Sequence, residues 1–158
     1  MLIFIMRHGE AEPNEWDDKS RMLTALGRKQ SSQSGIWMRQ MCESAGGEID
    51  LALISPYQRT QQTFECVSAE IRSKDRLTCE DIVPSSDPSD ALIYLDALYE
   101  TQPNLQSVLL VSHMPFVSYF LDSICRHHYS MLFSAGSIAA VRYTPGRAAS
   151  LAGQFLPE

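Results

Sequence analysis

Three short apolar runs, separated by segments long enough to hold helices, constrain the fold most strongly. They occupy residues 2–6, 49–55 and 107–112 and read LIFIM, IDLALIS and SVLLVS. Apolar runs of this length are typical of strands that are buried on both faces of a parallel sheet. Because parallel neighbours need long crossover connections, the pattern predicts an α/β fold with a mainly parallel sheet and helices on both of its faces.

The segments between the runs carry helix signals. Ser55 and Pro56 predict the cap and the first position of a helix that runs to about residue 72. The other expected elements follow from similar signals: a helix from Thr24 to about residue 45 that ends at Gly46 and Gly47, a weaker strand over residues 76–83, a helix after residues 84–90, a helix from Pro115 to about Cys125, and strands over residues 137–143 and 149–155.

Composition excludes several classes of protein. The chain has 158 residues, 44% of them hydrophobic, so we expect one domain spanning residues 1–158. The formal charge of −6 argues against a general nucleic-acid binder. No apolar run approaches the ~20 residues that cross a bilayer, and no basic residue precedes the first run, so we expect a cytoplasmic protein that does not bind membranes. The four cysteines form no CxxC pair and are expected to be reduced.

Each of the three apolar runs leads into chemically active side chains. Arg7 and His8 follow the first run, Arg59 lies just beyond the second, and His113 follows the third. Because ligands of open α/β sheets bind beyond the carboxyl ends of the strands, we expect these side chains to meet in one crevice. Arg59 would lie in the first turn of its helix, where backbone N–H groups and the helix dipole also favour an anion. The set predicts a site for a dianion, best matched by a phosphoryl group.

Each of these residues also has a structural explanation when taken alone. Arg7 could form a salt bridge, Arg59 could be a solvated helix residue and His113 could cap a helix. The shared position at strand ends favours the functional interpretation of the set. A metal site at His8 and His113 is disfavoured, because the flanking arginines would repel a cation and no ligand-spaced carboxylate or cysteine set lies nearby. We therefore expect no metal and no cofactor.

Three motifs in order resemble those of the histidine phosphatase superfamily: RHG at residues 7–9, SPYQRTQQT at residues 55–63 and SHMP at residues 112–115. The stretch RMLTALG at residues 21–27 is similar to an RxLTxxG stretch of its small bacterial branch, the SixA-type phosphohistidine phosphatases. The resemblance covers nearly the whole chain. It implies a three-layer α/β/α sandwich of the phosphoglycerate mutase-like type, without a lid insertion.

The resemblance also implies the reaction and the roles of the matching residues. His8 would be the nucleophile and would carry the phosphoryl group as a phosphohistidine. Arg7, Arg59 and His113 would hold the phosphate and balance the charge of the transition state. The implied enzyme is a metal-independent phosphohistidine phosphatase, and its implied partner is a phosphorylated protein such as the histidine phosphotransfer domain of a sensor kinase.

The sequence signals for Gly9, Arg21 and the candidate acid are weaker. Gly9 would let the backbone turn closely around the pocket, and Arg21 would contact the substrate. Larger members of the superfamily carry a glutamate acid in a long capping insertion, whereas residues 79–90 of this chain form only a short stretch. Asp81 is the candidate acid there, with Glu80 and Asp87 as alternatives, although each could also be an ordinary solvated carboxylate.

Rival functions follow from the same residues. The nearest is a phosphatase for a small phosphomonoester, and a mutase is less favoured because no capping insertion would retain an intermediate. A non-catalytic phosphate-binding module is the rival from another class. The histidine pair favours an enzyme, because anion binding alone could rely on arginines.

Overall fold

Six strands form one sheet in the computed structural model, which describes residues 1–13 and 16–158. The strands β1 to β4 run parallel, β5 pairs antiparallel with β1, and β6 pairs antiparallel with β5. The prediction of a mainly parallel sheet is therefore confirmed. In spatial order the strands are β3 (Arg72–Thr78), β2 (Glu48–Ile54), β4 (Ser107–Ser112), β1 (Leu2–Arg7), β5 (Ile138–Arg142) and β6 (Ser150–Phe155).

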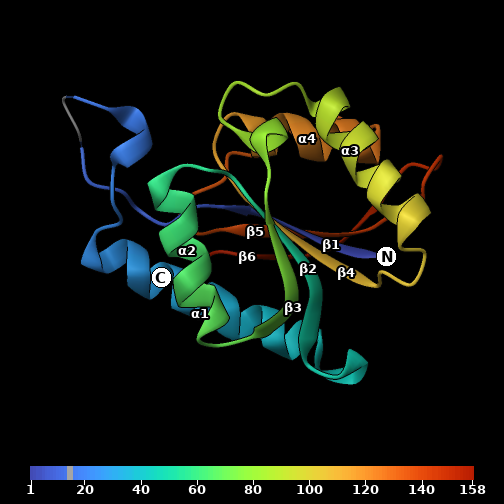
Figure 1. The fold of residues 1–158 in the computed structure, drawn as a ribbon, viewed down its shortest axis with the longest axis horizontal. Coiled ribbons are helices and arrows are strands. Elements are labelled where there is room, and N and C mark those ends of the chain that lie inside the picture. The colour runs from blue at the N-terminus through green and yellow to red at the C-terminus, as the bar shows by residue number, and fades with distance from the viewer. Residues whose placement is uncertain (14–15) are drawn as a thin grey trace.

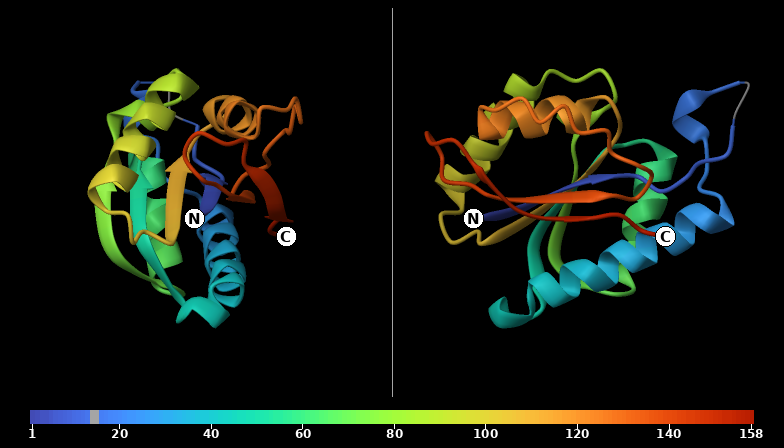
Figure 2. Two further views of the ribbon diagram at one scale, coloured as in Figure 1. Left: turned by 90° about the vertical axis from the view of Figure 1, so that its right-hand side faces the viewer. Right: turned by 180° about the vertical axis from the view of Figure 1, so that it is seen from behind.

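Helices cover both faces of the sheet (Figure 1). One face carries α1 (Ala25–Met41) and α2 (Gln58–Ser68), and the other carries α3 (Pro88–Thr101) and α4 (Phe116–Cys125). The two further views in Figure 2 show the same three layers, with β5 and β6 side by side at one edge. None of the helices in the described ranges is long and apolar enough to cross a bilayer.

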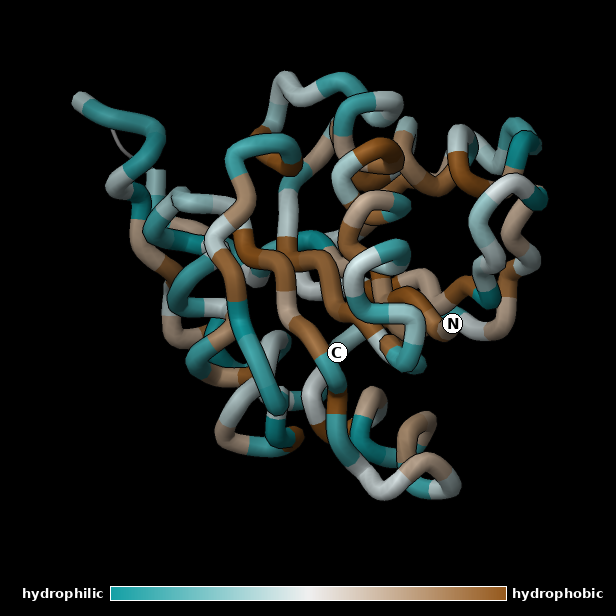
Figure 3. The backbone as a smooth tube through the Cα atoms, turned by 45° about the vertical axis from the view of Figure 1, so that its right-hand side comes forward, coloured by the Kyte–Doolittle hydropathy of each residue, from teal (hydrophilic) through white to brown (hydrophobic). Residues whose placement is uncertain are grey.

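Alternating side chains of the strands build two hydrophobic cores. In β1, Ile3 and Ile5 pack with residues of α3 and α4, whereas Phe4 and Met6 pack with residues of α1 and α2. All four side chains are fully buried, and burial of each contributes roughly 1.5–3 kcal/mol to stability. Figure 3 shows the hydrophobic segments of the interior strands passing through the centre of the molecule. This burial on both faces holds the strand ends in fixed positions.

The start of α2 differs from the sequence-based prediction. The helix begins at Gln58 with Tyr57 at its N-cap position, so the predicted cap at Ser55 and first position at Pro56 are wrong. The Ser55 hydroxyl instead lies 2.7 Å from Nε2 of His113. The local Ser-Pro signal was therefore overridden by a hydrogen bond to a distant part of the chain.

Two other boundaries also differ. The sequence predicts a strand at residues 76–83, but the observed strand, β3, spans Arg72–Thr78. It begins earlier because α2 ends at Ser68 rather than near residue 72. This strand lies at the edge of the sheet and is almost entirely exposed, so it lacks the apolar pattern of a buried strand. The helix that Thr24 caps ends at Met41, and the 3₁₀ helix η2 (Glu43–Ala45) continues the chain to the left-handed Gly46.

Candidate active site

The structure brings His8, Arg59 and His113 together beyond the carboxyl ends of neighbouring strands. The backbone N–H of His8 donates to the carbonyl of Ser112, the last residue of β4, at 3.0 Å. The Arg59 Nε atom donates to Nε2 of His8 at 3.2 Å, and the ring centroids of His8 and His113 lie 5.3 Å apart. The exposed fractions of His8, Arg59 and His113 are 6%, 3% and 1%. The parallel order of β2, β4 and β1 thus creates one buried polar cluster.

The hydrogen bonds of His8 define its tautomer. Its Nδ1 atom lies 2.6 Å from the carbonyl oxygen of Gly9, which can only accept, so Nδ1 carries the ring proton. Nε2 therefore presents a lone pair, to which Arg59 donates. Burial, and then the positive charge of nearby arginines, lower the pKa of His8 to about 3, although the Gly9 hydrogen bond acts in the opposite direction. At neutral pH, His8 is a neutral imidazole whose Nε2 lone pair accepts from Arg59.

Two buried nitrogen atoms of the cluster lack hydrogen-bond partners among the described residues: Nε of Arg7 and Nδ1 of His113. The other groups of these side chains are held in place. Arg7 donates from Nη1 to the carbonyl of Phe133 at 2.7 Å, and Nε2 of His113 lies 2.7 Å from the Ser55 hydroxyl. An unpaired buried donor costs about 1–3 kcal/mol, and an anionic ligand would remove that cost. These atoms therefore point to an oxyanion site.

His113 is also neutral. Burial, and then the proximity of His8 and of the arginines, lower its pKa to about 2. When the Ser55 hydroxyl donates to Nε2, Nδ1 carries the proton and can donate to an oxyanion. The Tyr57 ring meets the His113 ring edge-on at 4.7 Å between centroids, and Cζ of Arg59 lies 4.8 Å from the Tyr57 centroid. Tyr57 thus packs against two members of the cluster.

A glycine is required at position 9 because a side chain there would overlap the backbone of α1. A Cβ atom at Gly9 would lie 2.3 Å from the carbonyl oxygen of Gly27 in α1, and one at Gly27 would lie 2.1 Å from the carbonyl of Glu10. Gly9 is not among the glycines with positive φ, so close contact with α1, rather than a special turn, explains it. Its N–H donates to the Thr63 hydroxyl of α2 at 3.1 Å. The chain after β1 is thereby fastened to both helices.

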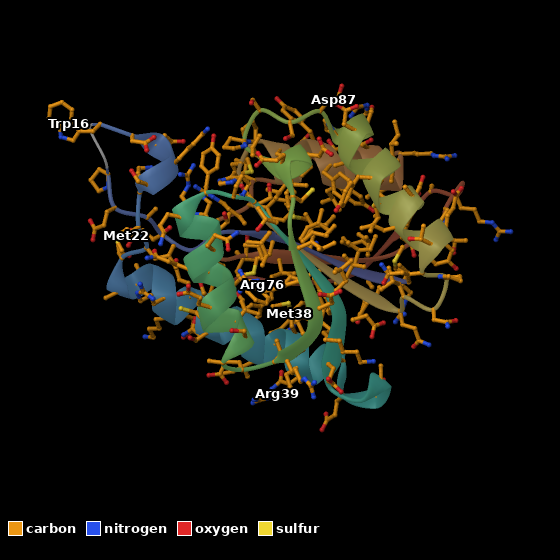
Figure 4. The ribbon with its side chains drawn as sticks, viewed as in Figure 1. Trp16, Met22, Met38, Arg39, Arg76 and Asp87 are labelled. Carbon is orange, nitrogen blue, oxygen red and sulfur yellow. The ribbon has the colours of Figure 1, made fainter. Side chains whose placement is uncertain are left out.

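Arg21 joins the cluster through a residue that the sequence analysis did not identify. Asp18, in the 3₁₀ helix η1 (Asp18–Ser20), accepts from Nε of Arg21 at 3.0 Å and from Nη2 of Arg59 at 3.2 Å. Its segment connects β1 to α1 and extends beyond the sheet next to the start of α2 (Figure 1). At the outer tip of this segment, Trp16 points away from the body of the molecule (Figure 4). The spacing of three residues between Asp18 and Arg21 was the only sequence signal for this contact.

The candidate acids lie in or after the 3₁₀ helix η3 (Glu80–Ile82). The Ser112 hydroxyl donates to the Ile82 carbonyl at 2.5 Å, so η3 is attached to the same sheet edge as the cluster. Asp81 is half-buried there and, within the described ranges, forms no hydrogen bond or ion pair with the cluster. Glu80 is exposed, and Asp87 caps α3 by accepting from a backbone N–H at 2.8 Å. Asp87, at the start of α3 in Figure 4, thus has a structural role.

The cluster suits an anion better than a cation. Across residues 1–13 and 16–158, no group of three or more His, Cys, Asp or Glu side chains is placed to hold a metal ion. Arg7, Arg59 and Arg21 supply positive charge instead, and the unpaired nitrogen atoms of Arg7 and His113 are positioned for oxygen acceptors. The arrangement can therefore bind a phosphoryl group and present it to Nε2 of His8.

Comparison with known proteins identifies the class. Residues 3–80 match the model of the histidine phosphatase superfamily (branch 1). A phosphohistidine phosphatase SixA homolog of Haemophilus influenzae is 33% identical over 162 residues, which cover 99% of this chain and 97% of that protein. The chain therefore belongs to the histidine phosphatase superfamily, and its match to SixA phosphatases makes it a hydrolase with a histidine nucleophile.

Further relatives place the chain in the SixA-type branch. Phosphohistidine phosphatase SixA of Escherichia coli is 33% identical over 143 residues, covering 89% of this chain and 84% of that protein. The solved structure of the protein histidine phosphatase SixA complexed with tungstate matches with a TM-score of 0.88 and 30% identity, covering 99% of this chain and 97% of that one. The expected phosphoglycerate mutase-like sandwich is thus confirmed.

Proposed function

We propose that this protein is a phosphohistidine phosphatase that removes the phosphoryl group from a histidine of another protein, with the histidine phosphotransfer domain of a sensor kinase as its partner. The observation that carries the proposal is the orientation of His8. Its Nδ1 proton is held by the Gly9 carbonyl, so that Nε2 carries an unprotonated lone pair, which faces Arg59. The names of the relatives, which are phosphohistidine phosphatases, support this substrate class.

In the first step, Nε2 of His8 attacks the phosphorus atom of the substrate phosphohistidine. A P–N bond to His8 forms as the P–N bond of the substrate breaks, and the leaving imidazole takes a proton from solvent. Arg7, Arg59 and His113 donate to the phosphoryl oxygens, where charge is concentrated in the transition state. Arg7 and His113 are already held by Phe133 and Ser55, whereas Nε of Arg59 must transfer its hydrogen bond from Nε2 of His8 to a phosphoryl oxygen.

In the second step, a water molecule attacks the phosphorus atom of phosphorylated His8. The bond between phosphorus and Nε2 breaks, inorganic phosphate leaves, and the water proton passes to solvent. The low pKa of His8 means that the released imidazole is neutral and ready for another attack. The Gly9 carbonyl keeps the ring in the same tautomer through both steps.

The leaving group favours a phosphohistidine substrate over a small phosphomonoester. An imidazole leaving group has a conjugate acid with a pKa of about 6.5, so solvent can protonate it near neutral pH. An alkoxide requires a positioned acid, and Asp81, the best candidate, has no hydrogen bond to the cluster within the described ranges. We also propose a cytoplasmic location, which the four unpaired cysteine thiols support.

A substrate comparison tests the proposal. We expect hydrolysis of a phosphorylated histidine phosphotransfer domain to have a kcat/KM well above that of aryl and alkyl phosphates. Free phosphohistidine serves as the matched control for the contribution of the protein partner. Faster turnover of a small phosphomonoester than of either phosphohistidine substrate would contradict the proposal, and binding of phosphate without turnover of any substrate would indicate a non-catalytic module.

A further inference from the structure

We propose that Asp18 is a positioning residue that holds Arg59 in the orientation needed to stabilise the phosphoryl group during its transfer and is itself fixed by Arg21, an inference that rests on the proposed function. Its side chain lies between the two guanidinium groups. Oδ2 accepts from Nη2 of Arg59 at 3.2 Å, and Oδ1 accepts from Nε of Arg21 at 3.0 Å. The backbone carbonyl of Asp18 accepts a third hydrogen bond, from Nη1 of Arg59 at 2.6 Å.

The geometry of the Arg59 guanidinium separates the two tasks of this side chain. A planar guanidinium has a terminal edge formed by Nη1 and Nη2 and a lateral edge formed by Nε and Nη2. Asp18 occupies the terminal edge, while Nε on the lateral edge points at Nε2 of His8. The edge that faces the nucleophile therefore remains directed at the position of the phosphoryl group. Asp18 binds the adjacent terminal edge and leaves Nε directed at His8.

Charge also favours this role. Burial, followed by repulsion from Arg59 and Arg21, lowers the pKa of Arg7. Burial raises the pKa of the Asp18 carboxyl, but the opposing effect of Arg59 and Arg21 is larger overall, so the pKa is lowered and the group is ionised at neutral pH. A single carboxylate thus offsets part of the repulsion within the arginine set. Removing the Asp18 carboxylate would leave the guanidinium groups without this hydrogen-bond acceptor and without the negative charge that offsets their repulsion.

Asp18 is itself largely exposed, whereas the Arg59 side chain that it holds is almost completely buried, with exposed fractions of 59% and 4%. The exposed position means that a substitution at Asp18 disturbs no core packing. Its effect on turnover should therefore pass through Arg59. This distinguishes a positioning residue from one that merely stabilises η1.

A double-mutant cycle tests the inference. The wild type, Asp18→Asn, Arg59→Ala and the double variant are assayed with the substrate that the wild type hydrolyses fastest among phosphoprotein, phosphohistidine and p-nitrophenyl phosphate. Asp17→Asn is the matched control, because it removes the same charge one residue away, and asparagine retains an oxygen that can accept from the Lys19 N–H as Asp17 does. The absence of wild-type turnover on all three substrates would contradict the proposed function and not the role of Asp18.

We expect Asp18→Asn to lower kcat by about 10- to 100-fold, as misplacement of a transition-state donor does, and to change the Kd for inorganic phosphate by less than about threefold. In the Arg59→Ala background the same substitution should change kcat by less than about twofold, and Asp17→Asn should behave like the wild type. Equal losses in both backgrounds would overturn the inference. Tighter phosphate binding with unchanged kcat would overturn it as well, because Asp18 would then be a competitor of the substrate.

A spectroscopic measurement extends the test to variants that turn over slowly. The ¹⁵N resonance of His8 Nε2 reports the hydrogen bond from Arg59. In Asp18→Asn this resonance should move toward its position in Arg59→Ala, whereas in Asp17→Asn it should stay at the wild-type position. A wild-type resonance in Asp18→Asn would show that Arg59 keeps its orientation without Asp18 and would overturn the inference.

Discussion

Acid should destabilise the protein through His8 and His113. Both rings are buried and neutral, and burial is the main reason why their pKa values are lowered to about 3 and about 2. In the unfolded chain each histidine has a pKa of about 6.5. Between these limits the unfolded state binds more protons than the folded state, so the free energy of unfolding must fall as the pH is lowered.

The size of the effect follows from proton linkage. Well below a pH of about 6.5, each buried histidine contributes a slope of about 1.4 kcal/mol per pH unit. Integrated from about pH 7 to about pH 5, the two residues together should lower the free energy of unfolding by about 4 kcal/mol. This is a large share of the roughly 5–15 kcal/mol that stabilises a typical domain.

Urea unfolding at a series of pH values in phosphate-free buffer measures this slope. The wild type is compared with the variant His8→Asn/His113→Asn, which cannot titrate at these positions. The control is His127→Asn/His128→Asn, which changes two exposed histidines. We expect the first variant to lose the steep pH dependence and the control to retain it, and the single variants His8→Asn and His113→Asn should each lose about half of it.

The reasoning would be refuted by equal pH slopes in the wild type and in His8→Asn/His113→Asn. Such a result would mean that both rings become protonated in the folded protein near their ordinary pKa. His8 would then be cationic below neutrality and unable to act as a nucleophile.

Four further predictions concern the site. Arg59→Lys should lower kcat/KM by roughly 100-fold, about 3 kcal/mol, because an ammonium lacks the planar fork, and wild-type kinetics would disprove the assignment of this residue. Gly9→Ala should lower the free energy of unfolding, measured in urea, by about 1–3 kcal/mol, because the added Cβ would overlap the Gly27 carbonyl. The control Gly153→Ala should have a smaller effect, because the atom nearest to its added Cβ would lie 3.4 Å away. Across leaving groups, phosphohistidine should react fastest, aryl phosphates weakly and alkyl phosphates hardly at all; rapid alkyl turnover that Asp81→Asn abolishes would identify Asp81 as an efficient acid. A chelator should leave turnover unchanged, and loss of activity that one divalent ion restores would contradict a metal-free mechanism.

The fold was predictable where the sequence carries strong burial signals. β1, β2 and β4 are apolar along most of their length because they lie in the interior of the sheet, and their parallel order follows from the helix-length connections between them. β3 lies at the edge and is exposed, so its boundaries could not be derived from apolar residues. The reversed direction of β5 depends on pairing with β1, which lies far away in the sequence.

The contacts that support the cluster were less predictable than its central residues. His8, Arg59 and His113 follow strand ends, so the topology alone predicts their proximity. Asp18 lies in a polar stretch and reaches Arg59 only through the folded path of the segment after β1. The local signal at Ser55 indicated a helix cap, whereas its actual contact with His113 joins residues that are distant in the sequence.

Trapping of the phosphorylated enzyme tests the central claim most directly. Brief incubation with ³²P-labelled phosphohistidine protein, followed by rapid quenching, should give acid-labile, base-stable label on His8. Because Nδ1 of His8 is held by the Gly9 carbonyl, hydrolysis of the labelled enzyme to amino acids should release the Nε2 isomer of phosphohistidine. His8→Ala should give neither label nor turnover. Label on another residue, the Nδ1 isomer, or wild-type turnover by His8→Ala would contradict the account.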